Sequence, residues 1–184
     1  MATNETPLIE TRNLKQYFKV KKSYLHAVDN ISLSIEKGKT LGVVGESGCG
    51  KSTLGRTILR LLEPTSGQIL YKGEDITKYS KAQMREMRSK MQIIFQDPYS
   101  SINPRLTVAE IIEEPMIVSK LGDHRARAER VNQMMDVVGL AGRLHDAYPH
   151  ELDGGRRQRI GIARALALNP EFIVCDEPVS ALDV

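Results

Sequence analysis

Gly45-Glu46-Ser47-Gly48-Cys49-Gly50-Lys51-Ser52-Thr53 is the stretch of sequence that decides the fold. It satisfies every position of the pattern G-x-x-x-x-G-K-[ST], a glycine-rich loop that holds phosphate groups. The apolar run at 41–44 before it predicts a buried parallel strand, and residues 53–62 after it predict a helix. Strand, loop and helix follow in the order that such a loop requires, so a nucleoside triphosphate is the expected ligand.

The chemistry of the loop positions supports the same ligand. Glycines let backbone N–H groups turn inward, and the start of the following helix adds unpaired donors. Lys51 is expected to reach the β- and γ-phosphates, and the Ser52 hydroxyl to bind Mg²⁺. The alternative is a glycine-rich turn that binds nothing. The residues predicted to hold the phosphates are Gly45, Ser47, Gly48, Gly50, Lys51, Ser52 and Thr53.

The composition is that of a globular protein with no marked charge bias. With 184 residues, 41% of them hydrophobic, the chain is long enough to bury one ordinary core. The net charge of +3 is spread along the sequence, so it gives no argument for nucleic acid, and none is expected as a partner. No apolar run approaches the roughly 20 residues that cross a bilayer. Cys49 and Cys175 lack the spacing of metal ligands and are expected to be reduced thiols.

The periodicity predicts a mixed α/β fold. Alternating apolar residues at 27–35, with the run at 8–14, predict an antiparallel sheet at the start, and further strands are expected at 68–71, 91–95 and 171–176. Residues 107–138 predict two helices and residues 156–168 a third. Within the first of these, Val108, Ile111 and Ile112 form an apolar stripe that fits either a core face or a partner's docking face.

A second motif lies near the end of the sequence. The apolar run at 172–175 leads directly into Asp176 and Glu177. Paired acids at a strand end often mark only a turn. Combined with a phosphate loop, they favour a site where Asp176 holds Mg²⁺ and Glu177 polarises a water molecule.

The segment 152–166, Leu-Asp-Gly-Gly-Arg-Arg-Gln-Arg-Ile-Gly-Ile-Ala-Arg-Ala-Leu, resembles the signature motif and helix of ATP-binding cassette ATPases. The resemblance implies that Asp153, Gly154 and Gly155 contact the nucleotide of a partner chain. It also implies that Gln96 is the Q-loop glutamine, which helps to bind Mg²⁺, and that Glu177 is the general base. Residues 180–183 are similar to the D-loop, and Phe18, with Tyr17 beside it, is similar in position to the aromatic that packs on adenine. Catalytic roles are thus implied for Glu177, Gln96 and Lys51, and metal binding for Ser52, Gln96 and Asp176.

The strings at 96–104, 148–152 and 175–184 are similar to the dipeptide and oligopeptide permease branch of that family, and most of all to its F-type subunit. The resemblance implies an α/β P-loop NTPase over 1–184, with a mixed or parallel sheet core. Residues 1–96 and 169–184 would form the core with an antiparallel β subdomain, and 97–168 an inserted helical subdomain with the signature motif. It also implies ATP and Mg²⁺ as cofactors, a second ATPase chain in a heterodimer, two permease subunits, indirect delivery by an external solute-binding protein, and a place on the cytoplasmic face of the membrane.

Two departures from the family pattern stand out. The signature usually has Ser where this chain has Asp153, and Gln where it has Arg156. An Asp153 carboxylate about 4 Å from a phosphate charge would cost about 4 kcal/mol at an effective dielectric of 20. This exceeds the roughly 1.5–3 kcal/mol of a lost charge-assisted hydrogen bond. Unless Arg156 compensates, or the change is simply tolerated, the two sites of a dimer should be unequal. The sequence also stops before the family's switch histidine, so a C-terminally truncated fragment is expected.

Three other functions remain open at this point. A nucleotide-binding module with little catalysis fits a truncated domain. A cassette ATPase acting on DNA or ribosomes is disfavoured, because such proteins commonly carry two cassettes or a coiled-coil insertion. The solute of a transporter could also be nickel or another small molecule, since specificity would lie in other subunits.

Overall fold

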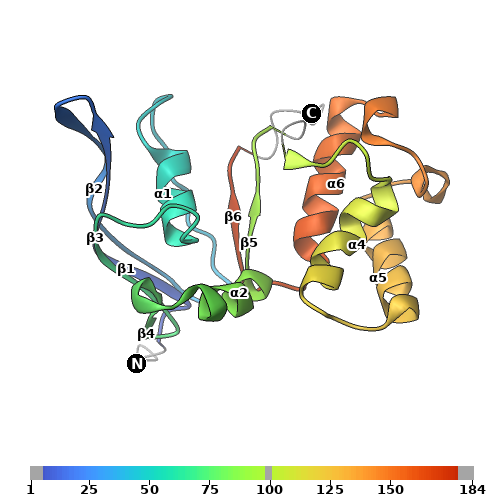
Figure 1. Cartoon of the computed structure of the whole chain (residues 1–184), viewed down its shortest axis with the longest axis horizontal. Helices are drawn as coiled ribbons and strands as arrows, with labels where there is room; N and C mark the ends of the chain where they lie inside the picture. The colour runs from blue at the N-terminus through green and yellow to red at the C-terminus, as the bar shows by residue number, and fades with distance from the viewer. Residues whose placement is uncertain (1–5, 98–100, 178–184) are drawn as a thin grey trace. The chain divides into compact units, whose positions relative to one another are not determined.

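The structure is a computed structural model that describes residues 6–97 and 101–177. The chain divides into two compact units, Met1–Arg85 and Glu86–Val184. Their elements are labelled in Figure 1, and each unit is described by itself. The whole predicted D-loop, residues 180–183, lies outside the described residues, as do residues 98–100 of the string that begins at Gln96.

The first unit is built on a four-stranded antiparallel sheet in the order β2-β1-β3-β4. Its strands are β1 (Ile9–Val20), β2 (Ser23–Ile35), β3 (Ser66–Tyr71) and β4 (Glu74–Asp75). β1 pairs with β2 as a long hairpin and with β3 on its other side, as the alternating sequence predicts. Helix α1 (Lys51–Ile58) follows the phosphate loop, and the short helix η1 (Ile76–Lys78) follows β4. The antiparallel opening of the fold is confirmed.

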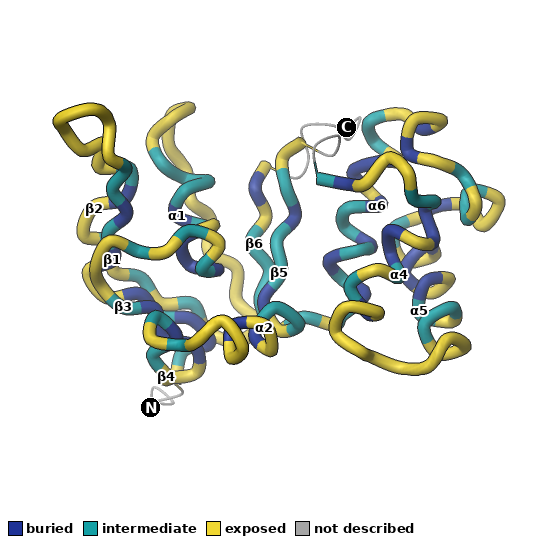
Figure 2. Tube along the Cα trace, viewed as in Figure 1, coloured by how far each residue is buried: buried dark blue, intermediate teal, exposed yellow. Residues whose placement is uncertain are grey.

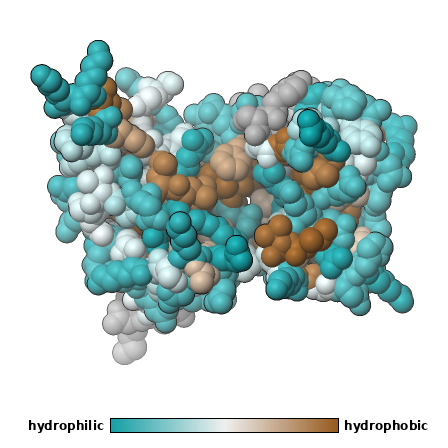
Figure 3. Space-filling model, viewed as in Figure 1, coloured by the Kyte–Doolittle hydropathy of each residue, from teal (hydrophilic) through white to brown (hydrophobic). Residues whose placement is uncertain are grey.

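The predicted strand at 41–44 is not formed. Within the described residues, neither sheet includes this segment. Leu41, Val43 and Val44 are 45%, 49% and 97% exposed. A strand needs a neighbour whose N–H and C=O groups complete its ladder, and local sequence does not supply one. On the face of the molecule shown in Figure 3, hydrophilic surface predominates, with brown hydrophobic patches within it.

The second unit combines a small parallel sheet with a helical block. Strands β5 (Met91–Ile94) and β6 (Phe172–Cys175) pair in parallel, in register from Met91 with Phe172 to Ile94 with Cys175. The block contains α4 (Val108–Val118), α5 (His124–Val137) and α6 (Gly154–Leu166), with the short helices η2 (Gly142–Leu144) and η3 (Pro149–Glu151). Helix α2 (Lys81–Lys90), which the sequence analysis did not predict, spans the division between the units.

The helical block has its own apolar core, drawn from α4, α5 and α6. Val108, Ile111 and Ile112 are 0%, 1% and 0% exposed, so the stripe that could have been a docking face packs inward. Helix α4 begins with a full capping box, in which Thr107 and Glu110 bond each other's backbone N–H groups. The buried blue interior of these three helices is visible in Figure 2.

Two arginines tie α5 and α6 to each other's ends. Arg130 of α5 donates through Nε to Ala167 O at 3.1 Å and through Nη2 to Leu166 O at 2.9 Å, at the end of α6. Arg159 of α6 donates through Nη1 to Val138 O and Gly139 O at 3.3 and 3.1 Å, at the end of α5. Each helix therefore satisfies the last carbonyls of the other. Across the described residues, no helix is long and apolar enough to span a membrane.

Candidate functional site

The phosphate loop lies in the first unit and depends on two glycines with positive φ. Gly48 has φ 79° and Gly50 has φ 98°, values that side-chain-bearing residues rarely adopt. Gly50 also has no room for a side chain, because a Cβ placed there would lie 2.1 Å from the carbonyl oxygen of Ala27 in β2. The glycine at position 50 therefore lets the loop turn into α1 while its backbone lies against β2.

The start of α1 carries the positive end of the helix dipole. Its N-cap is Gly50, the first turn contains no acidic residue, and among the described residues no side chain caps it. Ser52 and Thr53 lie half-buried in this first turn. Lys51 folds back over the loop, and its Nζ donates to Gly45 O at 2.8 Å and to Glu46 O at 2.9 Å. A helix start of this kind, with an ammonium group beside it, attracts anions.

Gln96, predicted to be the Q-loop glutamine, lies together with the two acids Asp176 and Glu177 in the second unit. Because β5 and β6 are parallel and in register, the residues that follow them leave the sheet at the same edge. There Gln96 Nε2 donates to Glu177 Oε2 at 2.6 Å, although the two residues are 81 positions apart in sequence. The backbone N–H of Asp176 donates to Ile94 O at 2.9 Å, and this residue is 7% exposed. The structure thus brings Gln96 and Glu177 into direct contact beside a buried Asp176.

Glu177 has a strained backbone. Its φ of 47° places it in the left-handed region, which costs a residue with a side chain roughly 1–2 kcal/mol. Strain of this kind persists only where the surrounding structure enforces it, and it clusters at functional sites. The turn aims the Glu177 carboxylate back at Gln96.

The signature turn opens helix α6. Asp153 is the N-cap, and its Oδ1 accepts the backbone N–H of Arg156 at 2.7 Å. Its Oδ2 lies 3.5 Å from Arg156 Nε, so both departures from the usual signature take part in one local interaction. The aspartate keeps the capping role that a serine has at such a position, because either side chain can accept from the third residue of a helix.

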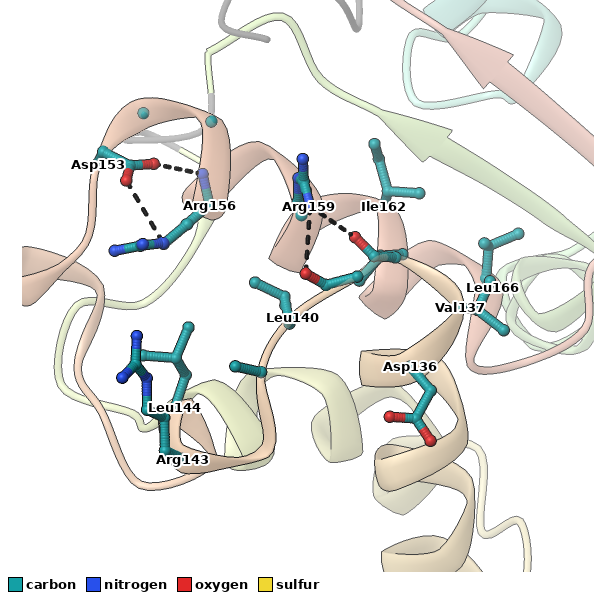
Figure 4. A pocket seen from close by; sticks show the side chains of 15 residues that line it. Asp136, Val137, Leu140, Arg143, Leu144, Asp153, Arg156, Arg159, Ile162 and Leu166 are labelled. Atoms are coloured by element: carbon teal, nitrogen blue, oxygen red, sulfur yellow. Dashed lines mark hydrogen bonds and ion pairs between the residues drawn. The ribbon is translucent and has the colours of Figure 1, made fainter. Parts of the chain in front are cut away.

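A pocket of about 1230 Å³ opens beside this turn. Figure 4 shows Arg143, Arg156 and Arg159 around it, with Leu140, Leu144 and Ile162 among the apolar side chains that line it. Gly154 and Gly155 also line it. The predicted signature residues therefore face an open, partly cationic hollow within the second unit.

The two aromatic residues of the predicted adenine contact, Tyr17 and Phe18, lie on opposite faces of the β1–β2 hairpin. Cross-strand pairs alternate between the two faces of the hairpin, and Tyr17 pairs with His26 whereas Phe18 pairs with Leu25. The ring of Tyr17 stacks on that of His26, and its hydroxyl donates to Asp29 Oδ1 at 2.6 Å. The sequence analysis named Phe18 and Tyr17 and did not single out His26 or Asp29, which contact Tyr17 in the structure. The pairing register of the β1–β2 hairpin places Tyr17, His26 and Asp29 together. Matching the alternation of the two strands in the sequence could have supplied this register.

Comparisons with known proteins bear on the family to which the chain belongs. The sequence profile of a family described as "ABC transporter" matches residues 28–180. The oligopeptide transport ATP-binding proteins AppF and OppF of Bacillus subtilis (strain 168) are 50% and 53% identical, over 100% and 96% of this chain. The chain spans only 58% and 59% of their lengths.

A solved structure shares the fold at lower identity. It is described as a dimeric post-hydrolysis state of the ATP-binding cassette MJ0796 bound to ADP and Pi. It is 31% identical, with a TM-score of 0.89, and the match covers 95% of this chain and 76% of that one. The cassette fold expected from the sequence is confirmed, and this chain belongs to the ABC transporter family.

Proposed function

We propose that this chain binds ATP and Mg²⁺ and hydrolyses ATP as the ATPase subunit of a peptide importer. Family membership supports nucleotide binding, and the names of the relatives, oligopeptide transport ATP-binding proteins, support the peptide solute. Nickel or another small solute is the alternative cargo. The proposed place of work is the cytoplasmic face of a membrane, bound to permease subunits.

The observation that carries the proposal is the Gln96–Glu177 hydrogen bond beside Asp176. Glu177 would act as general base toward the attacking water, and Gln96 would orient that carboxylate. Asp176, Ser52 and Gln96 would supply oxygen ligands to Mg²⁺, which matches the preference of that ion for hard oxygen donors. When bound, ATP supplies the phosphoryl group and Mg²⁺ neutralises charge on its oxygens.

The phosphate loop supplies the binding energy in this scheme. Lys51 Nζ already lies across the loop on two carbonyl oxygens, Gly45 O and Glu46 O. Phosphate oxygens would replace these carbonyls as acceptors, and charge-assisted bonds are about twice as strong as neutral ones. The remaining donors would come from the backbone N–H groups of Ser47, Gly48 and Gly50 and from the first turn of α1.

The signature turn supports a partner chain of the same class. Asp153, Gly154 and Gly155 line an open pocket, which a nucleotide held by a second ATPase chain would complete. We propose a heterodimer that moves two permease subunits, with solute arriving from an external binding protein. Within this chain, residues 1–96 and 169–184 would form the core and antiparallel subdomain, and residues 97–168 the helical subdomain.

The local geometry of Asp153 favours unequal sites. Its carboxylate caps its own helix and pairs with Arg156, whose side chain is 47% exposed. An exposed pair contributes only about 0–1 kcal/mol, so it offsets little of the repulsion toward a phosphate. The site that uses this chain's Lys51 and Glu177 would therefore turn over faster than the site that uses Asp153.

The test is Mg²⁺-dependent release of phosphate from ATP by the chain alone and mixed with partner ATPase chains. Turnover that needs a partner and is lost in Lys51→Ala is expected. Lys78→Ala is a matched control, because Lys78 is an exposed lysine of the same unit that lies outside the loop and pairs with Asp75. Binding without turnover in every mixture would favour the non-catalytic alternative.

The inequality of the sites has its own measurement. In a heterodimer, single-site inactivation of each chain separates the two turnover rates, and Asp153→Ser should raise the rate at the slower site. Equal rates at both sites in the unmodified heterodimer would refute the asymmetry.

A further inference from the structure

The turn end of the β1–β2 hairpin gathers positive charge without acidic residues. All of residues 19–25, the hairpin tip, are exposed, and three of them are lysines, Lys19, Lys21 and Lys22. Within the described residues, none of these three lysines forms an ion pair. The next acid along the chain, Asp29, already pairs with Lys15 at 3.6 Å. The tip therefore carries three positive charges that no ion pair of the fold neutralises.

Exposed apolar side chains lie beside these lysines. Val20, Tyr24 and Leu25 are 48%, 62% and 58% exposed. Cross-strand pairs alternate between the two faces of the hairpin, so Val20 and Leu25 share one face, while Lys19 and Tyr24, which are direct partners, lie on the other. The hairpin tip thus has an aliphatic side and a side of cationic and aromatic groups, and the whole turn end of the hairpin is exposed in Figure 2.

The turn places Lys21 in a conformation that favours glycine. Its φ is 53°, in the left-handed region, and the Ser23 hydroxyl donates to Val20 O at 3.2 Å across the turn. Glycine would adopt this conformation without the steric cost that a Cβ brings. A strained residue that the fold does not require points to a use for its side chain, and here that side chain is an exposed ammonium group.

Charge complementarity selects an anionic partner, and the aliphatic side chains select a lipid surface. The phosphate groups of lipids and of nucleic acids both attract lysines. A phosphodiester backbone offers nothing that buries Val20 or Leu25, whereas the boundary between lipid headgroups and acyl chains does. Tyrosine is enriched at that same boundary, where its ring is buried and its hydroxyl stays hydrated. The tip therefore matches a bilayer that contains anionic lipids.

We propose that the hairpin tip binds the surface of a bilayer rich in anionic lipid, with the three lysines at the headgroups and with Val20 and Leu25 at the acyl boundary. This role goes beyond the proposed ATPase function and depends on neither nucleotide nor peptide. Each lysine near an anionic surface changes partitioning about fivefold. A surface this small gives reversible binding, which would orient the chain on a membrane rather than anchor it.

Co-sedimentation of the chain with vesicles tests the electrostatic part. The vesicles are made either of phosphatidylcholine alone or of equal parts phosphatidylcholine and phosphatidylglycerol. Binding is expected only to the mixed vesicles, and Lys21→Gln/Lys22→Gln should weaken it roughly 20- to 30-fold. The matched control is Lys37→Gln/Lys39→Gln, which removes the same charge from exposed lysines just after β2. It should change binding by less than about twofold, because screening limits the effect of distant charges.

A single tryptophan tests the insertion of the aliphatic side. The sequence contains no tryptophan, so Leu25→Trp provides one emission signal, which should shift to the blue when mixed vesicles are added. Leu121→Trp is the control, because Leu121 is 49% exposed but lies outside the hairpin tip, and its emission should not shift. Circular dichroism of each variant checks that the fold is retained.

The outcomes are distinct. Equal binding of Lys21→Gln/Lys22→Gln and the unmodified chain to mixed vesicles overturns the proposal, as does equal binding of the chain to both kinds of vesicle. An unshifted Leu25→Trp emission overturns it too, because the aliphatic side would then stay in water. Binding of duplex DNA through the same lysines, with no binding of vesicles, would assign the tip to nucleic acid instead. Titration with ATP separates the two proposals, since a chain that binds ATP but not vesicles leaves the proposed function in place.

Discussion

Replacing Gly50 by alanine should damage both the fold and the phosphate loop. The added Cβ would lie 2.1 Å from Ala27 O, and real Cβ atoms essentially never approach another heavy atom within 3.0 Å. The contact is with backbone, which cannot rotate away as a side chain does. The left-handed φ of 98° adds a second cost. Strain of roughly 1–2 kcal/mol and overpacking of roughly 1–3 kcal/mol predict a total loss of about 2–5 kcal/mol.

Two other glycines of the same segment separate these costs. Gly48 has φ 79° but open space around its Cβ position, so Gly48→Ala carries strain without overlap. Alanine also reduces the conformational entropy of the unfolded chain, and this stabilises the folded state by about 0.4–1 kcal/mol, which offsets part of the strain. Gly42 has neither positive φ nor a neighbour within 4 Å, so Gly42→Ala should be neutral or slightly stabilising. The expected order of stability is therefore Gly42→Ala, then Gly48→Ala, then Gly50→Ala.

Thermal and urea unfolding followed by circular dichroism measure this order. Gly50→Ala should lower the melting temperature by roughly 4–20 °C, at about 2–4 °C for each kcal/mol in a chain of this size. It should also weaken triphosphate binding, because the loop has to move away from β2. A loss for Gly50→Ala within about 0.5 kcal/mol of that for Gly48→Ala would refute the close contact with Ala27, since additive effects agree to that margin.

Three further predictions concern other parts of the molecule. Glu177→Gln should abolish ATP turnover while ATP binding persists, measured by phosphate release and titration on one preparation. Arg157→Ala should lower the free energy of unfolding by about 1–3 kcal/mol, because Arg157 is 6% exposed and its Nε donates to Pro149 O at 2.6 Å; urea unfolding should show a larger loss than for the exposed Arg156→Ala. Burial raises the pKa of Asp75, but hydrogen bonds from Thr77 and Gln68 outweigh it and leave the pKa below its usual value. The advantage of the unmodified chain over Asp75→Asn should therefore be present above about pH 4 and vanish as the pH falls through the folded-state pKa, as urea midpoints at several pH values would reveal.

Elements with a regular apolar period could be predicted from the sequence. The strand at 27–35 and the helices within 107–138 and 156–168 all form close to the expected positions. Their apolar side chains recur every second residue in the strand and every three to four residues in the helices, so only that one secondary structure buries them on a single face. The segment 41–44 shows the limit of this reasoning, because its burial requires a pairing partner that a local pattern does not encode.

Helix α2 was missed although its start carries a readable signal. Ser80 and Gln83 have the spacing of a capping box, and the structure forms it, with Ser80 N–H donating to Gln83 Oε1 at 2.9 Å. Charged residues dominate the helix, so its apolar stripe, Met84 and Met87, is too sparse to give a clear period. Capping chemistry was the better guide at this position.

Site residues that belong to a sequence motif could be predicted. Contacts that depend on how two strands pair could not, because a local motif does not encode the register. The loop glycines and Glu177 follow from their motifs, whereas Gln96 is implied only by the resemblance to the family. The contact of His26 with Tyr17 depends on hairpin register, which is reset by bulges between Thr11 and Tyr17. One residue of slippage would bring Phe18 onto the face that Tyr17 occupies.

The exchange of arginines between α5 and α6 has a mechanical consequence. Arg130 donates hydrogen bonds to the last carbonyls of α6. Arg159 lies one turn into α6 from the signature glycines and donates to the carbonyls at the end of α5. Neither helix can slide along the other without breaking charged hydrogen bonds at both ends. A movement of α5 should therefore shift α6 and the signature turn with it, because the two helices are joined at both ends and would move as one rigid pair.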